Sequence, residues 1–288
     1  MGAFDLVVPA SLDQCLGFLE AHAEDAAVLA GGTDLGVAVR SGVKAPRAIV
    51  WVGRLQELRQ FRSSGGRISF GPGVTHREIA GHRDLLSAET LRKAARSVGS
   101  PQVRNVATAG GNLANASPAA DLYPPLLVLE AAIEVRSARK LSTVSVGDFV
   151  KGPGATALGP GELITGVSFQ EPGRETFSDF VKIGLRNAVA ISVANAAILA
   201  SLDRDRFATV RIACGAVAPK PERMPRVEAL LAGRGLTAEL LREVEETASG
   251  ECDPIADIRA SREYRRHVVG VIVARLVGTA WHNLRGSA

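Results

Sequence analysis

The chain has 288 residues, of which 46% are hydrophobic, and its formal net charge is +4 at pH 7. That length and apolar content are ample for folded cores in about two domains. Acidic and basic residues are interleaved without a block of like charge, and aromatic residues make up only 5% of the chain, so a nucleic-acid-binding surface is not expected.

The cysteines and the longest apolar stretches exclude further classes of protein. Cys15, Cys214 and Cys252 lie far apart with no C-x-x-C pair, so local spacing builds neither a zinc site nor an iron–sulfur cluster. An odd cysteine count without a disulfide framework suits a reducing compartment, and no apolar stretch reaches the roughly 20 residues that a transmembrane helix needs. We therefore expect a cytoplasmic protein with no transmembrane segment and no metal ligand set.

The residues up to Gly53 predict a small α/β unit. Apolar residues recur with the helical spacing of three and four after Ser11, and short apolar runs end at glycine or proline. The expected strands are 4–9, 28–30 and 48–52, with one helix that opens at residues 11–13 and a short helix at 34–41.

A second region begins near Leu55 and alternates strands with helices. Thr75-His-Arg-Glu78 has the pattern of a capping box, which predicts a helix start. A helix at 87–98 is expected to end at Ser100-Pro101. The expected strands are 67–70, 73–75, 132–136 and 162–169.

The third region predicts an antiparallel sheet followed by helices. No internal repeat and no low-complexity linker divides the chain, which favours three packed subdomains over separate modules. We therefore predict an α+β (mixed α/β) protein. The expected strands are 176–183, 191–202 and 207–217, and the expected helices are 227–232, 237–249 and 261–282.

The segment Thr108-Ala-Gly-Gly-Asn-Leu-Ala-Asn-Ala-Ser-Pro-Ala-Ala-Asp121 gathers glycines, amides, hydroxyls and a carboxylate between apolar segments. Gly110 and Gly111 lack a Cβ, so the backbone can take positive φ and its N–H groups can approach a ligand closely. Successive N–H groups turned one way form an anion-binding nest, which suits a diphosphate, and Asp121 could take a ribose hydroxyl. The alternative is a turn between two elements.

A second segment, Val28-Leu-Ala-Gly-Gly-Thr-Asp-Leu35, repeats this chemistry. A short apolar run ends in Gly31 and Gly32, and Thr33 and Asp34 are good N-cap residues for the helix that follows. The pattern predicts a strand, a glycine turn and a helix start with free N–H groups facing a ligand.

Together, the segments A-G-G-T-D-L and T-x-G-G-N-x-A-N-A-S-P-A-A-D-L resemble the two FAD-binding signatures of the molybdenum hydroxylases, in the medium subunit of the xanthine dehydrogenase and carbon monoxide dehydrogenase family. The resemblance implies a two-lobed FAD-binding domain of the vanillyl-alcohol-oxidase (PCMH) type, with lobes 1–54 and 55–172, and a C-terminal α+β domain at 173–288. The residues that it implies for FAD binding are Leu29, Ala30, Gly31, Gly32, Thr33, Asp34, Thr108, Ala109, Gly110, Gly111, Asn112, Asn115, Ser117, Asp121, Ile164 and Lys182.

The resemblance also implies how these residues divide along FAD. Residues 30–34 and 108–112 would wrap the diphosphate, and Asn115, Ser117 and Asp121 would reach the diphosphate or the ribose. Ile164 and Lys182 would lie near the flavin end, where a cation stabilises the anionic reduced flavin and tunes its potential. Relatives usually carry a branched residue at the position of Ala109 and often an aspartate at that of Ala190, so this chain lacks one carboxylate near the flavin.

The implied function is that of an oxidoreductase subunit. It would accept electrons from [2Fe–2S] clusters on a small partner subunit and pass them through FAD to an external acceptor, while molybdopterin lies on a large partner subunit, in a dimer of heterotrimers. No side chain is expected to be a catalytic acid or base, because flavin supplies the redox chemistry. Two alternatives stay open, namely a self-contained flavin oxidase of the same fold and a non-catalytic nucleotide-binding assembly module.

Two further groups of residues are predicted to lie on the surface. The five histidines are scattered in polar contexts. Tyr264-Arg265-Arg266 reads as a solvated helix face on which Glu263 pairs with Arg266. We expect neither group to contribute to a site.

Overall fold

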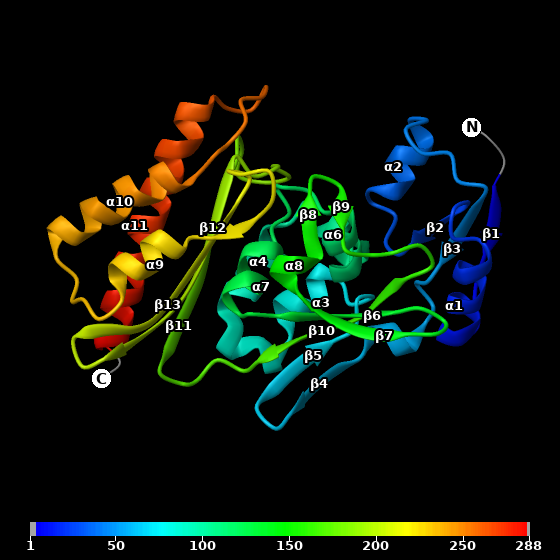
Figure 1. Cartoon of the computed structure of the whole chain (residues 1–288), viewed down its shortest axis with the longest axis horizontal. Coiled ribbons are helices and arrows are strands. Elements are labelled where there is room, and N and C mark those ends of the chain that lie inside the picture. The colour runs from blue at the N-terminus through cyan, green and yellow to red at the C-terminus, as the bar shows by residue number, and fades with distance from the viewer. Residues whose placement is uncertain (1–3, 287–288) are drawn as a thin grey trace.

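The computed structural model describes residues 4–286, in which three regions follow one another along the long axis, each built on its own sheet (Figure 1). The N-terminal region, in blue, lies at one end, and the C-terminal helices, in orange and red, lie at the other. Within the described residues, no helix is long and apolar enough to cross a membrane.

The first region is a three-stranded parallel sheet with helical crossovers, as predicted. The strands follow the order β1-β3-β2, and parallel neighbours need connections long enough for a helix. Leu16 and Leu19 of the first helix pack in one cluster with Val50 of the central strand. The elements are β1 (Asp5–Val7), α1 (Leu12–Ala21), β2 (Ala26–Leu29), α2 (Leu35–Arg40) and β3 (Ala48–Trp51).

The second region is a five-stranded antiparallel sheet with helices packed on it. Its strand order is β4-β5-β10-β6-β7, and a two-stranded hairpin, β8-β9, stands apart. The strands are β4 (Phe61–Ser64), β5 (Arg67–Phe70), β6 (Ala132–Arg136), β7 (Leu141–Ser145), β8 (Val150–Gly152), β9 (Ala155–Thr156) and β10 (Leu163–Gln170). The helices are η1 (Gln56–Arg59), α3 (His76–Gly81), η2 (Arg83–Ala88), α4 (Glu89–Ser97), α5 (Pro101–Val106), α6 (Ala109–Asn115), α7 (Tyr123–Val128) and α8 (Val146–Phe149).

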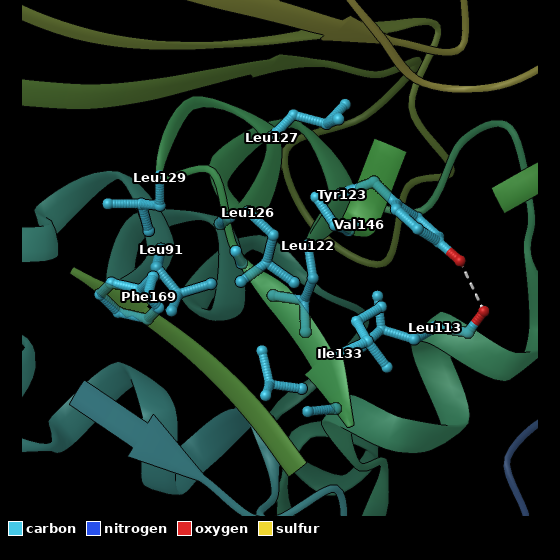
Figure 2. Packing of buried hydrophobic residues seen from close by; sticks show 14 of the residues in the cluster. Leu91, Leu113, Leu122, Tyr123, Leu126, Leu127, Leu129, Ile133, Val146 and Phe169 are labelled. Atoms are coloured by element: carbon cyan, nitrogen blue, oxygen red, sulfur yellow. Dashed lines mark hydrogen bonds between the residues drawn. The ribbon is translucent and has the colours of Figure 1, made fainter. Parts of the chain in front are cut away.

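The core of this region joins its sheet to α4, α6 and α7. Leu91 of α4, Leu126 of α7 and Phe169 of β10 belong to the same buried cluster (Figure 2). The buried hydroxyl of Tyr123 donates a hydrogen bond of 2.7 Å to the carbonyl oxygen of Leu113 in α6. This bond ties α7 to the helix that carries the second glycine pair.

The structure confirms one local prediction for the second region and corrects two others. The capping box is confirmed, because Thr75 and Glu78 exchange both hydrogen bonds. Residues 73–75 form no strand, and only Thr75 makes an isolated bridge, to Thr108. Ser100-Pro101, predicted as the end of a helix, is also the start of another, because Ser100 caps α5 and Pro101 stands in its first turn, where a proline needs no N–H partner.

The third region is an antiparallel sheet in the order β11-β12-β13-β14, with helices against it. Successive side chains of β12 face opposite sides, so Ile198 and Ala200 pack with the C-terminal helices while Ala197 and Leu199 join the core of the second region. The sheet is therefore covered on both faces (Figure 1). The elements are β11 (Thr176–Ile183), β12 (Ala194–Asp203), β13 (Arg206–Gly215), β14 (Glu222–Arg223), α9 (Pro225–Leu231), α10 (Ala238–Glu251) and α11 (Arg262–Gly286).

Candidate cofactor-binding site

A cavity of about 1220 Å³ is lined by residues from all three regions. It brings together both glycine segments, Ile164 and Lys182, which are far apart in the sequence. Every residue predicted for FAD binding lines it except Leu29, the last residue of β2, and Ala109, which is fully buried in the core. The lining also includes four residues that sequence reasoning did not select, namely His76, Val98, Ser192 and Arg265.

The first glycine segment forms a turn between β2 and α2. Gly32 has φ of +75°, a conformation that favours glycine. Gly31 is needed for close approach, because a Cβ there would lie 1.9 Å from the carbonyl oxygen of Val106. Asp34 stands at the N-cap position as predicted, but its side chain makes no capping bond. Its carboxylate instead accepts a hydrogen bond of 3.4 Å from the side-chain amide of Asn115, across to the second segment.

The second glycine segment is a helix start, and this corrects the prediction of a positive-φ loop. Gly110 and Gly111 lie in the first turn of α6, and Thr108 caps that helix by accepting from the N–H of Gly111 at 3.1 Å. A Cβ on Gly110 would lie 2.5 Å from the Cβ of Pro72. The glycine at 110 is therefore required by close packing and not by an unusual φ.

Backbone donors are distributed unequally between the two segments. The N–H groups of residues 109–112 are already bonded, to the carbonyl oxygens of Val74, Pro72 and Thr108 and to the Thr108 hydroxyl. The predicted nest is thus not formed there. In contrast, no hydrogen bond between described residues uses the N–H groups of residues 31–34, all of which line the cavity. A row of free donors can bind an anion without a lysine.

Asp121 and Lys182 form a buried ion pair in the cavity wall, with Nζ 2.6 Å from Oδ2. Lys182 also donates to the carbonyl oxygen of Ser97 at 3.2 Å. The other carboxylate oxygen, Oδ1, accepts from the hydroxyl of Ser192 at 2.6 Å and from the amide of Asn195 at 2.8 Å. The carboxylate of Asp121 is thus held by three side chains of its own chain, an arrangement that differs from the expected contact with a ribose hydroxyl.

His76 corrects the prediction that the histidines are surface residues, because only 1% of it is exposed. The backbone N–H of His76 donates to the carbonyl oxygen of Ala107, and this bond holds α3 against the second glycine segment. Burial, followed by the positive charges of Arg104 and Lys182, lowers the pKa of His76 to about 4, so the imidazole is neutral at pH 7. The capping box beside it was the available signal that this residue begins a packed helix.

Arg265 corrects the prediction of a solvated helix face, because only 2% of it is exposed. Its guanidinium donates to the carbonyl oxygens of Val193 and Ala216, each at 2.8 Å, and to Asp257 at 2.8 Å. Arg265 therefore holds three loops of the third region beside the cavity. Val98, the last residue of the helix predicted at 87–98, is instead the C-cap residue of α4 and lines the cavity.

Two family models match nearly the whole chain. Residues 2–170 match the FAD binding domain in molybdopterin dehydrogenase, and residues 179–280 match the CO dehydrogenase flavoprotein C-terminal domain. The chain belongs to the family of FAD-binding domains of molybdopterin dehydrogenases. The resemblance seen in the two glycine segments is thereby confirmed.

Individual members of this family are similar over almost their full length. The glyceraldehyde dehydrogenase medium chain of Sulfolobus acidocaldarius is 31% identical over 274 residues, which cover 94% of this chain and 96% of that one. The xanthine dehydrogenase FAD-binding subunit of Escherichia coli O157:H7 is 30% identical over 260 residues, covering 88% of each.

Solved structures confirm the predicted fold class, a mixed α/β FAD-binding domain followed by a C-terminal domain. A carbon monoxide dehydrogenase from Hydrogenophaga pseudoflava superposes with a TM-score of 0.94 at 25% identity, covering 98% of both chains. Quinoline 2-oxidoreductase from Pseudomonas putida 86 superposes with a TM-score of 0.92 at 27% identity and the same coverage.

The cavity fits FAD, the cofactor that the family model names. The free N–H groups of residues 31–34 suit a diphosphate. The side-chain oxygen of Asn112 is buried in the cavity wall without a partner in the described part of the chain, which leaves an acceptor for a ligand hydroxyl or N–H group. Lys182, which also lines the cavity, supplies a cation. The free N–H groups, the amide oxygen of Asn112 and the ammonium of Lys182 suit FAD, which has a charged diphosphate in its middle and a polar flavin ring at one end.

Proposed function

We propose that this chain is the FAD-binding electron-transfer subunit of a heteromeric molybdopterin-dependent hydroxylase, and that FAD occupies the cavity. The observation that carries the proposal is the row of unpaired N–H groups at residues 31–34, which faces a cavity shared by all three regions. When bound, FAD supplies one- and two-electron redox chemistry. The chain itself supplies the position and the electrostatic environment of the cofactor.

The residues divide into three roles in this proposal. The N–H groups of residues 31–34 bind the diphosphate, Gly111 leaves room for it beside α6, and Gly110 lets α6 pack against Pro72. Asn112, Asn115 and Ser117 offer polar side chains along the same wall. Ile164 and Lys182 contact the flavin ring, and Lys182 places positive charge beside it. We assign Asp121 to Lys182 instead of to the ribose, because its carboxylate already bonds three side chains.

We infer that the other redox centres lie on partner subunits. Support comes from relatives named as medium chains or FAD subunits, among them the carbon monoxide dehydrogenase medium chain of Afipia carboxidovorans. Within the described residues, no group of three or more His, Cys, Asp or Glu side chains is placed to hold a metal. Molybdopterin then belongs to a large subunit and the [2Fe–2S] clusters to a small one, in a dimer of heterotrimers.

We also propose the division into lobes 1–54 and 55–172 and a C-terminal domain, 173–288. The sheets support it, since each of the three larger sheets falls within one of these ranges. A cytoplasmic location is part of the proposal as well. It is supported by the three cysteines, which are buried and free.

The test is to purify the chain with and without its partner subunits, desalt it, record the visible spectrum and identify the nucleotide released on denaturation. We expect a flavin spectrum and released FAD, and reduction of the bound flavin only when partners and their substrate are present. A complex that reduces its acceptor normally with a flavin-free copy of this chain would refute the role. Turnover by the isolated chain would favour the self-contained oxidase, and a bound nucleotide other than a flavin would favour the assembly module.

A further inference from the structure

The ion pair between Asp121 and Lys182 is embedded in a polar cluster that also contains Ser192 and Asn195. Neither Ser192 nor Asn195 is exposed at all, and only 5% of Asp121 is. The hydroxyl of Ser192 and the amide of Asn195 both donate to Oδ1 of Asp121, while the ammonium of Lys182 donates to Oδ2. One oxygen of this carboxylate therefore binds the lysine, and the other binds the two neutral donors.

The strand register explains why these donors converge. Lys182, near the end of β11, lies directly opposite Asn195, near the start of β12. Ser192 stands just before β12, and its hydroxyl lies 3.3 Å from the amide nitrogen of Asn195. Asp121 comes from the loop between α6 and α7, in the second region. The cluster is thus a contact between the C-terminal sheet and the loop that continues the second glycine segment.

We infer that Ser192 and Asn195 are positioning residues that set, through Asp121, how much positive charge Lys182 presents to the flavin. The inference rests on the proposed function, because it requires FAD in the cavity with its ring near Lys182. Lys182 and Ser192 both line that cavity, and Asp121 lies in the wall between them.

The physical reason is that the ammonium of Lys182 and the neutral donors bind the same carboxylate, that of Asp121. In a site of low effective dielectric, Asp121 cancels much of the field of Lys182 because the two charges are 2.6 Å apart. Hydrogen bonds from neutral donors stabilise the carboxylate charge and draw it toward Oδ1, away from the lysine. The ammonium then keeps more of its effect on a neighbouring group. A stronger positive field favours the anionic reduced flavin and raises its reduction potential.

Two variants are predicted to shift the reduction potential of bound FAD in opposite directions. Ser192→Ala removes one donor to Oδ1, so Asp121 neutralises Lys182 more fully and the potential moves to a more negative value. Asp121→Asn removes the counter-charge, so the potential moves to a more positive value. Both are measured by redox titration of the purified, FAD-loaded complex, alongside the dissociation constant of FAD.

Ser178→Ala is the matched control. Ser178 is a buried serine of β11 whose hydroxyl bonds to the backbone of Thr90 and Ser87 and does not line the cavity. Its variant should keep the wild-type potential. Equal shifts in the Ser178 and Ser192 variants, or no shift in the Ser192 variant with FAD bound, would overturn the inference.

The outcomes separate this inference from the proposed function. If the wild-type complex holds no FAD, the proposed function fails and no potential exists to compare. If FAD binds and the Ser192→Ala potential equals that of the wild type, only the inference fails. Should Asp121→Asn not fold, because its lysine is left as a buried unpaired charge, Ser192→Ala and its control still decide the question.

Discussion

Alanine substitutions at two glycines should separate folding from cofactor binding. At Gly31, a Cβ would lie 1.9 Å from the carbonyl oxygen of Val106 and 2.9 Å from the Cα of Ala107, so backbone must move. At Gly111, the nearest atom would be the hydroxyl oxygen of Thr108 at 3.2 Å, and the methyl group would occupy the cavity instead of the core. Gly31→Ala therefore strains the contact between the first and second regions, whereas Gly111→Ala only reduces the volume of the cavity.

The magnitudes follow from these contacts. Overpacking against backbone costs about 1–3 kcal/mol, and we place Gly31→Ala at the upper end because the overlap is with main-chain atoms. At roughly 2–4 °C of melting temperature per kcal/mol for a chain near this size, Gly31→Ala should lower the melting temperature by about 4–12 °C. Gly111→Ala gains about 1 kcal/mol of helix propensity and loses about as much if the Thr108 cap loosens, so its melting temperature should change little.

Differential scanning fluorimetry of the apoprotein tests the predicted changes in melting temperature, and titration with FAD tests the predicted change in affinity. Gly111→Ala should weaken FAD binding at least tenfold, about 1.4 kcal/mol, and Gly111→Val should abolish it while the fold persists. Wild-type affinity in a well-folded Gly111→Val protein would refute the placement of FAD against α6. An unchanged melting temperature in Gly31→Ala would refute the packing argument for the first segment.

Three further variants test the interactions that hold the site. Tyr123→Phe removes one of two hydrogen bonds to the carbonyl oxygen of Leu113, which still accepts from the N–H of Ala116, and should lower the free energy of unfolding in urea by about 0.5–1.5 kcal/mol. Arg265→Met leaves the carbonyl oxygens of Val193 and Ala216 without their donor, while Arg259 still bonds Asp257, and in the same assay should cost about 1–3 kcal/mol for each carbonyl. Burial raises the pKa of Glu78, but hydrogen bonds from Thr75 and the charge of Arg59 outweigh burial and hold the pKa below its usual range. The stabilisation is therefore fully present above the usual pKa of a glutamate and is lost as pH falls through the lowered pKa, so Glu78→Gln should flatten the acid decline of the melting temperature.

The fold was predictable wherever one local signal dominated. The capping box at Thr75 and the apolar run that predicts a strand at 191–202 depend on residues close in sequence; the capping box forms, and the strand is found as β12, Ala194–Asp203. β4 and β7 were missed because they are edge strands that are short, largely exposed and rich in serine and threonine, so few apolar residues mark them. The helix α5 was missed because Ser100-Pro101 was read as a break, although serine followed by proline is also a common helix start.

Which residues line the cavity was largely predictable, but their interactions with one another were not. The two glycine segments and Lys182 do meet in one cavity, since their motifs carry the polar chemistry. Which N–H groups stay free depends on Val74 and Pro72, which lie more than thirty residues before α6 and carry no motif. His76 and Arg265 were misplaced for a related reason, because a charged or titratable residue on a helix is usually exposed unless tertiary contacts supply its partners.

The partners of Asp121 show why a motif carboxylate need not touch the ligand. A lysine that is only 11% exposed in its side chain is costly to bury unless an opposite charge lies beside it. Asp121, at the end of the second glycine segment, supplies that charge, and Ser192 and Asn195 complete the hydrogen bonds of its carboxylate. The same carboxylate then fixes the lysine in the cavity wall and joins the C-terminal sheet to the FAD-binding domain. Losing it should therefore disturb the flavin environment even though no contact between Asp121 and FAD is required.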